Sequence, residues 1–182
     1  LRVINENIEK VLLDEEQISE ICRSLGKRIT EDYKNKDLIA VGILKGCVVF
    51  FSDLIRNIDL DCSIDFMVVS SYGNATESTG MVQILKDLSI DIKGKNILVV
   101  EDIVDSGVTL CNVKNVFLKR GAAEVKICTF LDKPARRKAD ICVDYVGATI
   151  PDEFVVGYGL DYAEKYRNLP YLGVLKRQVY EK

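Results

Sequence analysis

Residues 99–109 of this chain read Val99-Val100-Glu101-Asp102-Ile103-Val104-Asp105-Ser106-Gly107-Val108-Thr109. The apolar residues of 96–100 predict a buried strand, residues 101–107 a turn, and the spacing of apolar residues after it a helix over 108–120. Residues 125–131 form a second apolar run of strand length. A strand, a helix and a strand at this spacing predict a right-handed crossover onto a parallel sheet.

The segments before this unit fit the same fold class. Asp14, followed by Gln17, has the pattern of a capping box and predicts the start of a helix with an apolar stripe over 18–29. Residues 38–44 predict a buried strand, and residues 47–58 predict a further helix.

A strand over 64–70 and an extended segment over 81–86 follow. The small and polar residues 72–80 between them predict a mobile loop. We therefore expect an α/β fold, in which helices cover both faces of a parallel sheet.

The loop after the strand at 96–100 has the residues of a sugar-phosphate site. In open parallel sheets, ligands bind beyond the carboxyl ends of the strands. Two adjacent acids, Glu101 and Asp102, are costly there unless they meet a cation or hydroxyl groups. Ser106 and Gly107 open the next helix, where free N–H groups and the helix dipole favour an anion.

The loop by itself leaves other interpretations open. Acids after a buried strand are common, and Asp-Ser-Gly is also an ordinary turn and helix cap. A receiver-type domain that accepts a phosphoryl group, or another nucleotide-binding fold, would carry the same acids. The chain has no Gly-x-x-x-x-Gly-Lys-Ser/Thr sequence, which excludes the usual NTPase loop.

The composition limits the classes of function. With 182 residues the chain has the length of one domain, and its net charge of −3 without a basic block argues against a nucleic-acid partner. No apolar run approaches the roughly 18–20 residues that span a bilayer. Six scattered cysteines without a Cys-x-x-Cys pair favour the cytoplasm. Because the chain has no histidine, a general base must be Asp, Glu, Lys, Tyr or Cys.

Residues 99–109 resemble the phosphoribosyl pyrophosphate signature of type I phosphoribosyltransferases, in which apolar residues and two acids precede Asp-Ser/Thr-Gly-x-Thr. Further segments are similar, in the same order, to hypoxanthine-guanine phosphoribosyltransferases, especially the compact bacterial ones. These segments are Leu44-Lys45-Gly46, Ser70-Ser71-Tyr72-Gly73, Leu131-Asp132-Lys133-Pro134, Phe154-Val155-Val156-Gly157-Tyr158-Gly159-Leu160-Asp161 and Arg167-Asn168-Leu169-Pro170. The resemblance covers nearly the whole chain. It implies a purine salvage enzyme that joins hypoxanthine or guanine to the ribose phosphate of phosphoribosyl pyrophosphate, giving IMP or GMP.

The resemblance implies roles for the residues of the signature. Glu101 and Asp102 would hold ribose hydroxyls and, with Asp161, help to place Mg²⁺. Asp105 would be the general base that takes the proton from the attacking purine nitrogen, although a helix cap is the other interpretation of this residue. The phosphoribosyl group and its 5′-phosphate would be bound by Glu101, Asp102, Ile103, Val104, Asp105, Ser106, Gly107, Val108 and Thr109.

The resemblance also assigns the purine site. Lys133 would donate to the 6-oxo group, which favours hypoxanthine and guanine over adenine. Phe154 would stack on the base, Val155 would contact its edge through the backbone, and Asp161 would lie near it. Taken alone, Lys133 is also consistent with a solvated turn and Phe154 with the apolar core.

Pyrophosphate would be bound by Lys45, Gly46 and Arg167. The family has a non-proline cis peptide in the Lys45–Gly46 loop, and an exposed salt bridge is the other interpretation of Arg167. A lid over about 70–81, which would exclude water from the reaction, would begin with Ser70, Ser71 and Tyr72.

We expect one domain over 1–182, with a Rossmann-like core at about 37–150 and a small hood from the N-terminal segment and about 151–182. The resemblance implies a homodimer or homotetramer, without a nucleic-acid or membrane partner. Three alternatives stay open. They are a sister enzyme that uses adenine, orotate or uracil, a regulatory protein that binds nucleotides and RNA, and a receiver-type domain, which would lack residues 154–170.

Overall fold

The larger sheet of the molecule carries most of the core. The structure, a computed structural model, describes residues 4–71 and 82–181. Within these ranges the sheet has six strands in the spatial order β4-β3-β2-β5-β6-β7, all parallel except β4, which runs antiparallel to β3. The strands are β2 (Leu38–Leu44), β3 (Cys62–Ser71), β4 (Val82–Lys86), β5 (Asn96–Val104), β6 (Glu124–Asp132) and β7 (Tyr145–Thr149).

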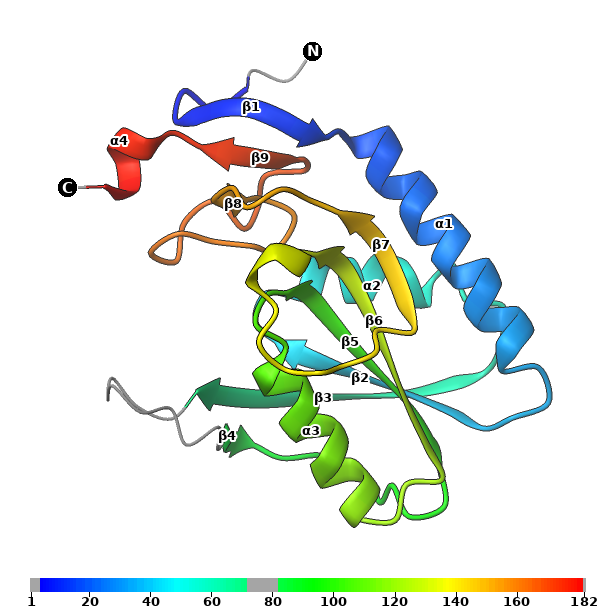
Figure 1. Cartoon of the computed structure of the whole chain (residues 1–182). Coiled ribbons are helices and arrows are strands. Elements are labelled where there is room, and N and C mark those ends of the chain that lie inside the picture. Colours follow the sequence, from blue (N-terminus) through cyan, green and yellow to red (C-terminus); the bar gives the residue numbers. More distant parts are fainter. Residues whose placement is uncertain (1–3, 72–81, 182) are drawn as a thin grey trace.

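Helices cover both faces of this sheet, as predicted. α1 (Glu15–Asp32) and α2 (Val48–Ile55) pack on one face, and α3 (Val108–Lys119) packs on the other (Figure 1). Side chains of β2 alternate between the two faces, so Ala40 lies in the core under α1 and α2 while Val41 lies under α3. The parallel pair β5 and β6, joined by α3, is confirmed.

α1 begins with the predicted capping box. Asp14 accepts a hydrogen bond from the Gln17 N–H, and the Gln17 side chain accepts one from the Asp14 N–H, both at 2.9 Å. The helix predicted over 47–58 is shorter, because α2 ends at Ile55 and a turn follows. None of the helices in the described ranges has the length and apolar composition that a bilayer crossing requires.

The predicted turn over 101–107 is wrong in its first half. β5 continues to Val104, because β6 runs on beside it and pairs with it as far as Asp132. Only residues 105–107 turn before α3. The loop predicted over 72–80 lies outside the described residues.

A second, smaller sheet is built from both ends of the chain. Its antiparallel strands, in the order β1-β9-β8, lie above one end of the core (Figure 1). This is the predicted hood, and its elements confirm the fold class, while the boundaries of core, hood and lid stay predictions. The elements of the hood are β1 (Ile8–Leu13), β8 (Val155–Val156), β9 (Leu172–Leu175) and the short helix α4 (Arg177–Tyr180). In the core, a 3-10 turn η1 (Pro134–Arg136) follows β6.

Asp65 is a buried acid that ties β3 to the segment after β4. Its carboxylate accepts hydrogen bonds from Lys86 Nζ at 3.1 Å and from the Ser89 N–H at 2.6 Å. Burial alone would raise the pKa of Asp65, but the hydrogen bonds from the Phe66 and Ser89 N–H groups and from Lys86 lower it below its usual value. The folded protein therefore favours the ionised carboxylate.

We expect Asp65→Asn to lower the free energy of unfolding near pH 7 by about 1–3 kcal/mol, because the four donors to this carboxylate lose a charged acceptor. The folded pKa lies below the unfolded value of about 3.9, so the carboxylate stabilises the fold above about pH 4 and this contribution is lost as pH falls through the folded pKa. Urea unfolding near pH 7 and near pH 3 measures the difference, with the exposed Asp91→Asn as the control. This account would be contradicted if the difference in unfolding free energy between the parent and Asp65→Asn did not shrink at the lower pH.

Candidate active site

The turn between β5 and α3 requires glycine at position 107. Gly107 has a φ of 77°, and a Cβ at this position would lie 2.8 Å from Ile141 Cγ2. The Ser106 carbonyl accepts hydrogen bonds from the N–H groups of Lys138 and Ala139 at 2.9 and 3.0 Å. The N-terminus of α3 follows at once, so N–H groups without a partner inside the helix lie beside this turn, and that of Val108 donates to Ser106 Oγ at 3.4 Å.

A cavity of about 240 Å³ opens over this turn. Its lining includes most of the residues predicted to bind the phosphoribosyl group, together with apolar residues of β2, β3 and α3. The lining residues are Ile43, Leu44, Val69, Glu101, Ile103, Val104, Asp105, Ser106, Gly107, Thr109 and Leu110.

Glu101 and Asp102 place two carboxyl groups side by side at the end of β5. Burial raises the pKa of Glu101 well above its usual range, and the neighbouring Asp102 carboxylate raises it further. A cation or hydroxyl groups would relieve this repulsion. Mg²⁺ in proteins is usually held by one or two carboxylates plus substrate phosphates and water, so this pair fits it.

Asp161 does not join these two acids, because the described residues contain no cluster of three or more potential metal ligands. Its carboxylate is paired with Arg167 Nη2 at 2.8 Å and accepts the Glu164 N–H at 2.8 Å. Arg167 also donates from Nη1 to the Gly159 carbonyl at 2.8 Å. Both predicted residues therefore lie together in the 157–170 segment, already bonded to each other.

Asp105 has one carboxylate oxygen that no described group contacts by a hydrogen bond. Its Oδ1 is buried and has no hydrogen-bond partner in the part of the chain that the structure describes. Buried polar atoms are nearly always paired, so an unpaired one at a loop with this composition indicates a functional group. The Asp105 backbone carbonyl is held by Arg137 Nε at 3.3 Å, which keeps the residue in place.

The Lys45–Gly46 segment packs directly against two other parts of the site. A Cβ at Gly46 would lie 1.7 Å from Asp102 Oδ2, and a Cβ at Gly159 would lie 2.1 Å from the Gly46 carbonyl oxygen. Glycine at both positions therefore permits the contact of three chain segments. The cis peptide is the Leu44–Lys45 bond, one bond earlier than expected from the Lys45–Gly46 loop.

The predicted purine residues lie where the hood meets the core. Lys133 is 5% exposed, and its Nζ donates to the Glu153 carbonyl at 2.9 Å. Phe154 follows and is 37% exposed. Val155 is buried in β8, and its backbone pairs with β9. Of the predicted lid residues, Ser70 and Ser71 end β3, and Tyr72 lies outside the described residues.

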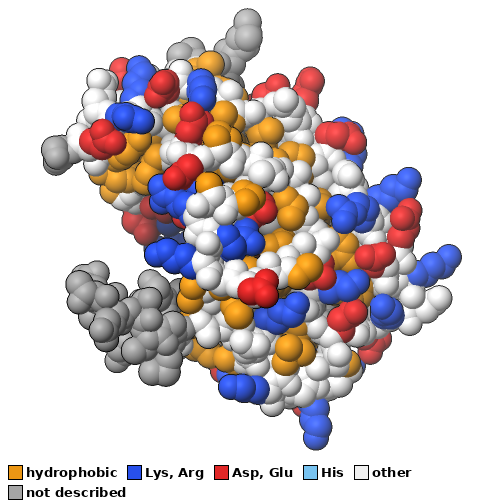
Figure 2. Space-filling model, in the orientation of Figure 1, with side chains coloured by type: hydrophobic (Ala, Val, Ile, Leu, Met, Phe, Trp, Pro, Cys, Tyr) orange, Lys and Arg blue, Asp and Glu red, His pale blue; other side chains and the backbone are white. Residues whose placement is uncertain are grey.

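The sequence interpretation missed a basic group beside Asp105. A cavity of about 430 Å³ is lined by Asp105, Ser106, Ala135, Arg136, Arg137 and Lys138. Arg137 pairs with the Asp132 carboxylate and so joins the residue before Lys133 to the Asp105 turn. Figure 2 shows several Lys and Arg side chains gathered where the hood meets the core. Three cations within residues 136–138 were the available signal.

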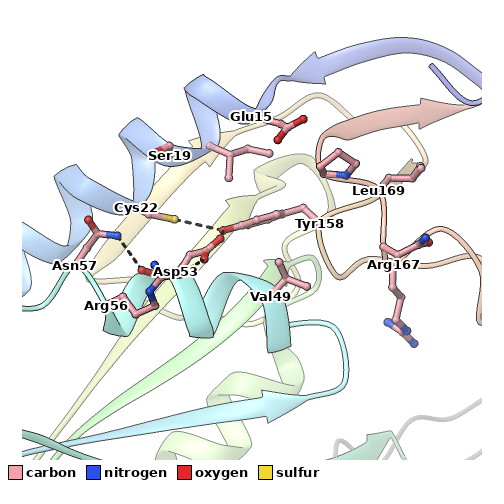
Figure 3. Close-up of a pocket in the computed structure, with 13 residues that line it drawn as sticks. Glu15, Ser19, Cys22, Val49, Asp53, Arg56, Asn57, Tyr158, Arg167 and Leu169 are labelled. Carbon is pink, nitrogen blue, oxygen red and sulfur yellow. Dashed lines mark hydrogen bonds and ion pairs between the residues drawn. The ribbon is translucent and has the colours of Figure 1, made fainter. Parts of the chain in front are cut away.

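A larger cavity lies elsewhere, between α1, α2 and the 157–170 segment, with a volume of about 520 Å³ (Figure 3). Tyr158 points into it, and its hydroxyl donates to Asp53 Oδ2 at 2.7 Å. Among the predicted site residues, only Arg167 lines it. The smaller cavity over the 105–107 turn is the better candidate, because the unpaired acid and the helix N-terminus meet there.

Comparisons with known proteins agree with one another. Residues 10–163 match the model of the phosphoribosyl transferase domain. The chain is 56% identical over 179 residues to a hypoxanthine-guanine phosphoribosyltransferase of Staphylococcus epidermidis, covering 98% of this chain and 100% of the relative. A solved hypoxanthine phosphoribosyltransferase of Staphylococcus aureus superposes with a TM-score of 0.94 at 56% identity, covering 97% of this chain and 96% of that one. A solved hypoxanthine-guanine phosphoribosyltransferase of Bacillus anthracis superposes with a TM-score of 0.89 at 50% identity, covering 93% of this chain and 99% of that one.

We expect Glu101→Gln to raise the Tm of the metal-free protein at neutral pH. Because the folded pKa of Glu101 lies above the unfolded value of about 4.3, ionisation above that pH favours unfolding, and glutamine removes this effect. Thermal unfolding in a chelator, near pH 7.5 and near pH 4, measures it, and the gain should vanish in acid. Glu9→Gln, exposed on β1, is the control. A lower Tm at neutral pH would show that the carboxylate stabilises this site instead.

Proposed function

The chain belongs to the phosphoribosyltransferase family, and we propose that it transfers the 5-phosphoribosyl group of phosphoribosyl pyrophosphate to hypoxanthine or guanine, releasing pyrophosphate. The product would be IMP or GMP, which makes this a purine salvage enzyme. One observation carries the proposal. The unpaired carboxylate oxygen of Asp105 lies in the turn that leads into the N-terminus of α3, next to the acid pair on β5.

We propose that the core binds the sugar and its phosphate. The 105–109 turn offers backbone N–H groups and two hydroxyls to the 5′-phosphate, as an anion at a helix N-terminus requires. Glu101 and Asp102 hold the ribose hydroxyls and Mg²⁺, which supplies neutralisation of the pyrophosphate charge. Asp161 remains a proposed further ligand, although its carboxylate would first have to exchange its ion pair with Arg167.

Purine recognition is assigned to the boundary of hood and core. An ammonium group has three donors, and Lys133 Nζ gives one to Glu153, so donors remain for a 6-oxo group. Phe154 offers an exposed ring for stacking, which contributes about 1–3 kcal/mol per base in other proteins. The Val155 backbone and Asp161 would contact the edge of the base.

The proposed reaction breaks the bond between the anomeric carbon and pyrophosphate and forms a bond from that carbon to a purine nitrogen. The proton of that nitrogen goes to Asp105. Lys45, Gly46 and Arg167 bind the departing pyrophosphate, where the fork of an arginine suits a bidentate contact. Ser70, Ser71 and Tyr72 begin a lid that keeps water from the sugar.

The proposal extends to the assembly and the compartment. On the basis of the family resemblance we propose a homodimer or homotetramer. We propose the cytoplasm as its compartment, because all six thiols are unpaired. Acidic and basic side chains are interspersed over most of the visible face in Figure 2, in keeping with small-molecule substrates rather than nucleic acid.

Incubation with phosphoribosyl pyrophosphate, Mg²⁺ and each of hypoxanthine, guanine, adenine, orotate and uracil tests the function. IMP and GMP should form, and chelation of the metal should stop their formation. Nucleotide from adenine, orotate or uracil alone would favour a sister enzyme. No nucleotide from any base would overturn the proposed reaction.

Asp105→Asn should lower kcat for IMP formation by about 10²–10⁴, because the amide cannot accept the purine proton. The dissociation constant for phosphoribosyl pyrophosphate should change little, because the amides of the turn remain. Steady-state kinetics and calorimetry measure the two quantities. Asp91→Asn, exposed before β5 at the opposite end of the strand, is the matched control. Near-normal turnover of the Asp105 variant would remove this residue from the base role.

Lys133→Ala should reduce the preference for hypoxanthine over adenine, because the donor to the 6-oxo group is lost. The ratio of kcat/KM for the two bases measures the preference, and we expect a loss of at least about tenfold. Lys126→Ala, near the start of the strand that ends one residue before Lys133, controls for the loss of a lysine from this part of the fold. An unchanged ratio would mean that another group distinguishes the two bases.

A further inference from the structure

The Phe154 ring is already packed between other aromatic rings. Tyr180 stacks on it with ring centroids 4.7 Å apart and an interplanar angle of 21°. Tyr162 meets it edge to face at 5.6 Å and 87°. Offset stacking and edge-to-face contact are the two favoured arrangements of aromatic pairs. Two tyrosines therefore fix the position and the tilt of this phenylalanine.

Tyr180 reaches Phe154 because the chain after β9 is anchored on the hood. The Leu175 N–H donates to the Phe154 carbonyl at 2.9 Å, and the Lys176 N–H donates to the Asn7 carbonyl at 2.9 Å. α4 follows directly, with its Val179 N–H bonded to the Lys176 carbonyl at 3.0 Å. The stack thus joins the end of the chain to the start of β8.

Tyr180 packs on a different side of the hood from the main core. Its ring contacts the small cluster that includes Val156 and Tyr171, whereas Val155 faces the large core. Figure 1 places α4 at the outer end of the hood, away from β6. Phe154 keeps 37% of its surface exposed despite both tyrosine contacts. One face of its ring is covered by Tyr180, so a base could stack only on the opposite face.

We propose that Tyr180 is a positioning residue for purine binding, whose ring braces one face of Phe154 so that the other face is ready for the base. The proposal rests on the function given above. A ring held in place before the ligand arrives loses less conformational freedom when the base binds. The brace therefore contributes to affinity for the base but not for the sugar phosphate, which the core binds. Tyr162 supports the same ring from its edge.

Four variants separate stacking from general stability. Tyr180→Ala should raise the dissociation constant for GMP and the KM for guanine by about 2- to 10-fold, the range that one aromatic pair contributes. The dissociation constant for phosphoribosyl pyrophosphate and kcat should change less than about twofold. Tyr180→Phe should restore the parent values, because the contact is made by the ring. Tyr180→Leu fills similar space without a flat face and should behave like the alanine variant. Val179→Ala, in the same helix, is the matched control for loosening of α4 and should leave GMP binding unchanged.

Calorimetry with GMP and with phosphoribosyl pyrophosphate, together with thermal unfolding, gives the decisive pattern. Equal GMP affinity in the parent and in Tyr180→Ala overturns the proposal, as does full rescue by leucine. Tighter GMP binding in Tyr180→Ala also overturns it, since Tyr180 would then occupy the place of the base. If the parent protein forms IMP but the variants do not show this pattern, only the positioning role of Tyr180 is overturned. If the parent protein forms no nucleotide, the proposed function is overturned as well.

Discussion

Two adjacent carboxyl groups at the end of a buried strand are the constraint around which the site is built. Glu101 and Asp102 repel each other where burial already disfavours charge, and the pKa of Glu101 is raised as a result. A sheet gains nothing from such a pair in its own core. The pairing of β5 with β6 as far as Val104 nonetheless holds both residues on a rigid strand. The folded chain therefore has a place that a cation or sugar hydroxyls would stabilise.

Glycines bring the other segments to these acids. Gly46 approaches Asp102 so closely that any Cβ would collide, and Gly159 approaches Gly46 in the same way. The Lys45–Gly46 segment thus contacts both Asp102 and the 157–170 segment, and Arg167 donates to the Gly159 carbonyl. A missing side chain at two positions decides whether three distant parts of the sequence can form one site.

The division into core and hood would separate the two kinds of recognition that we propose. The core has the helix N-terminus and the acids, which suit a sugar phosphate and are indifferent to the base. The hood presents Phe154, and buried Lys133 bonds the carbonyl just before it. Because the hood is made from both ends of the chain, Tyr180 of α4 can act on the aromatic ring that the base is proposed to contact.

Much of the fold could be predicted from the sequence, because its helices and strands depend on local periodicity. Residues that are close together in the sequence determine the capping box at Asp14, the strand at 38–44 and the helix after Gly107. The family resemblance supplied the site residues, which stay proposals. Strand pairing across the sheet, however, extended β5 through the acids. Contacts over long separations placed Arg137 against Asp105 and Tyr180 against Phe154. No local pattern encodes such contacts, since they arise only when packing brings remote segments together.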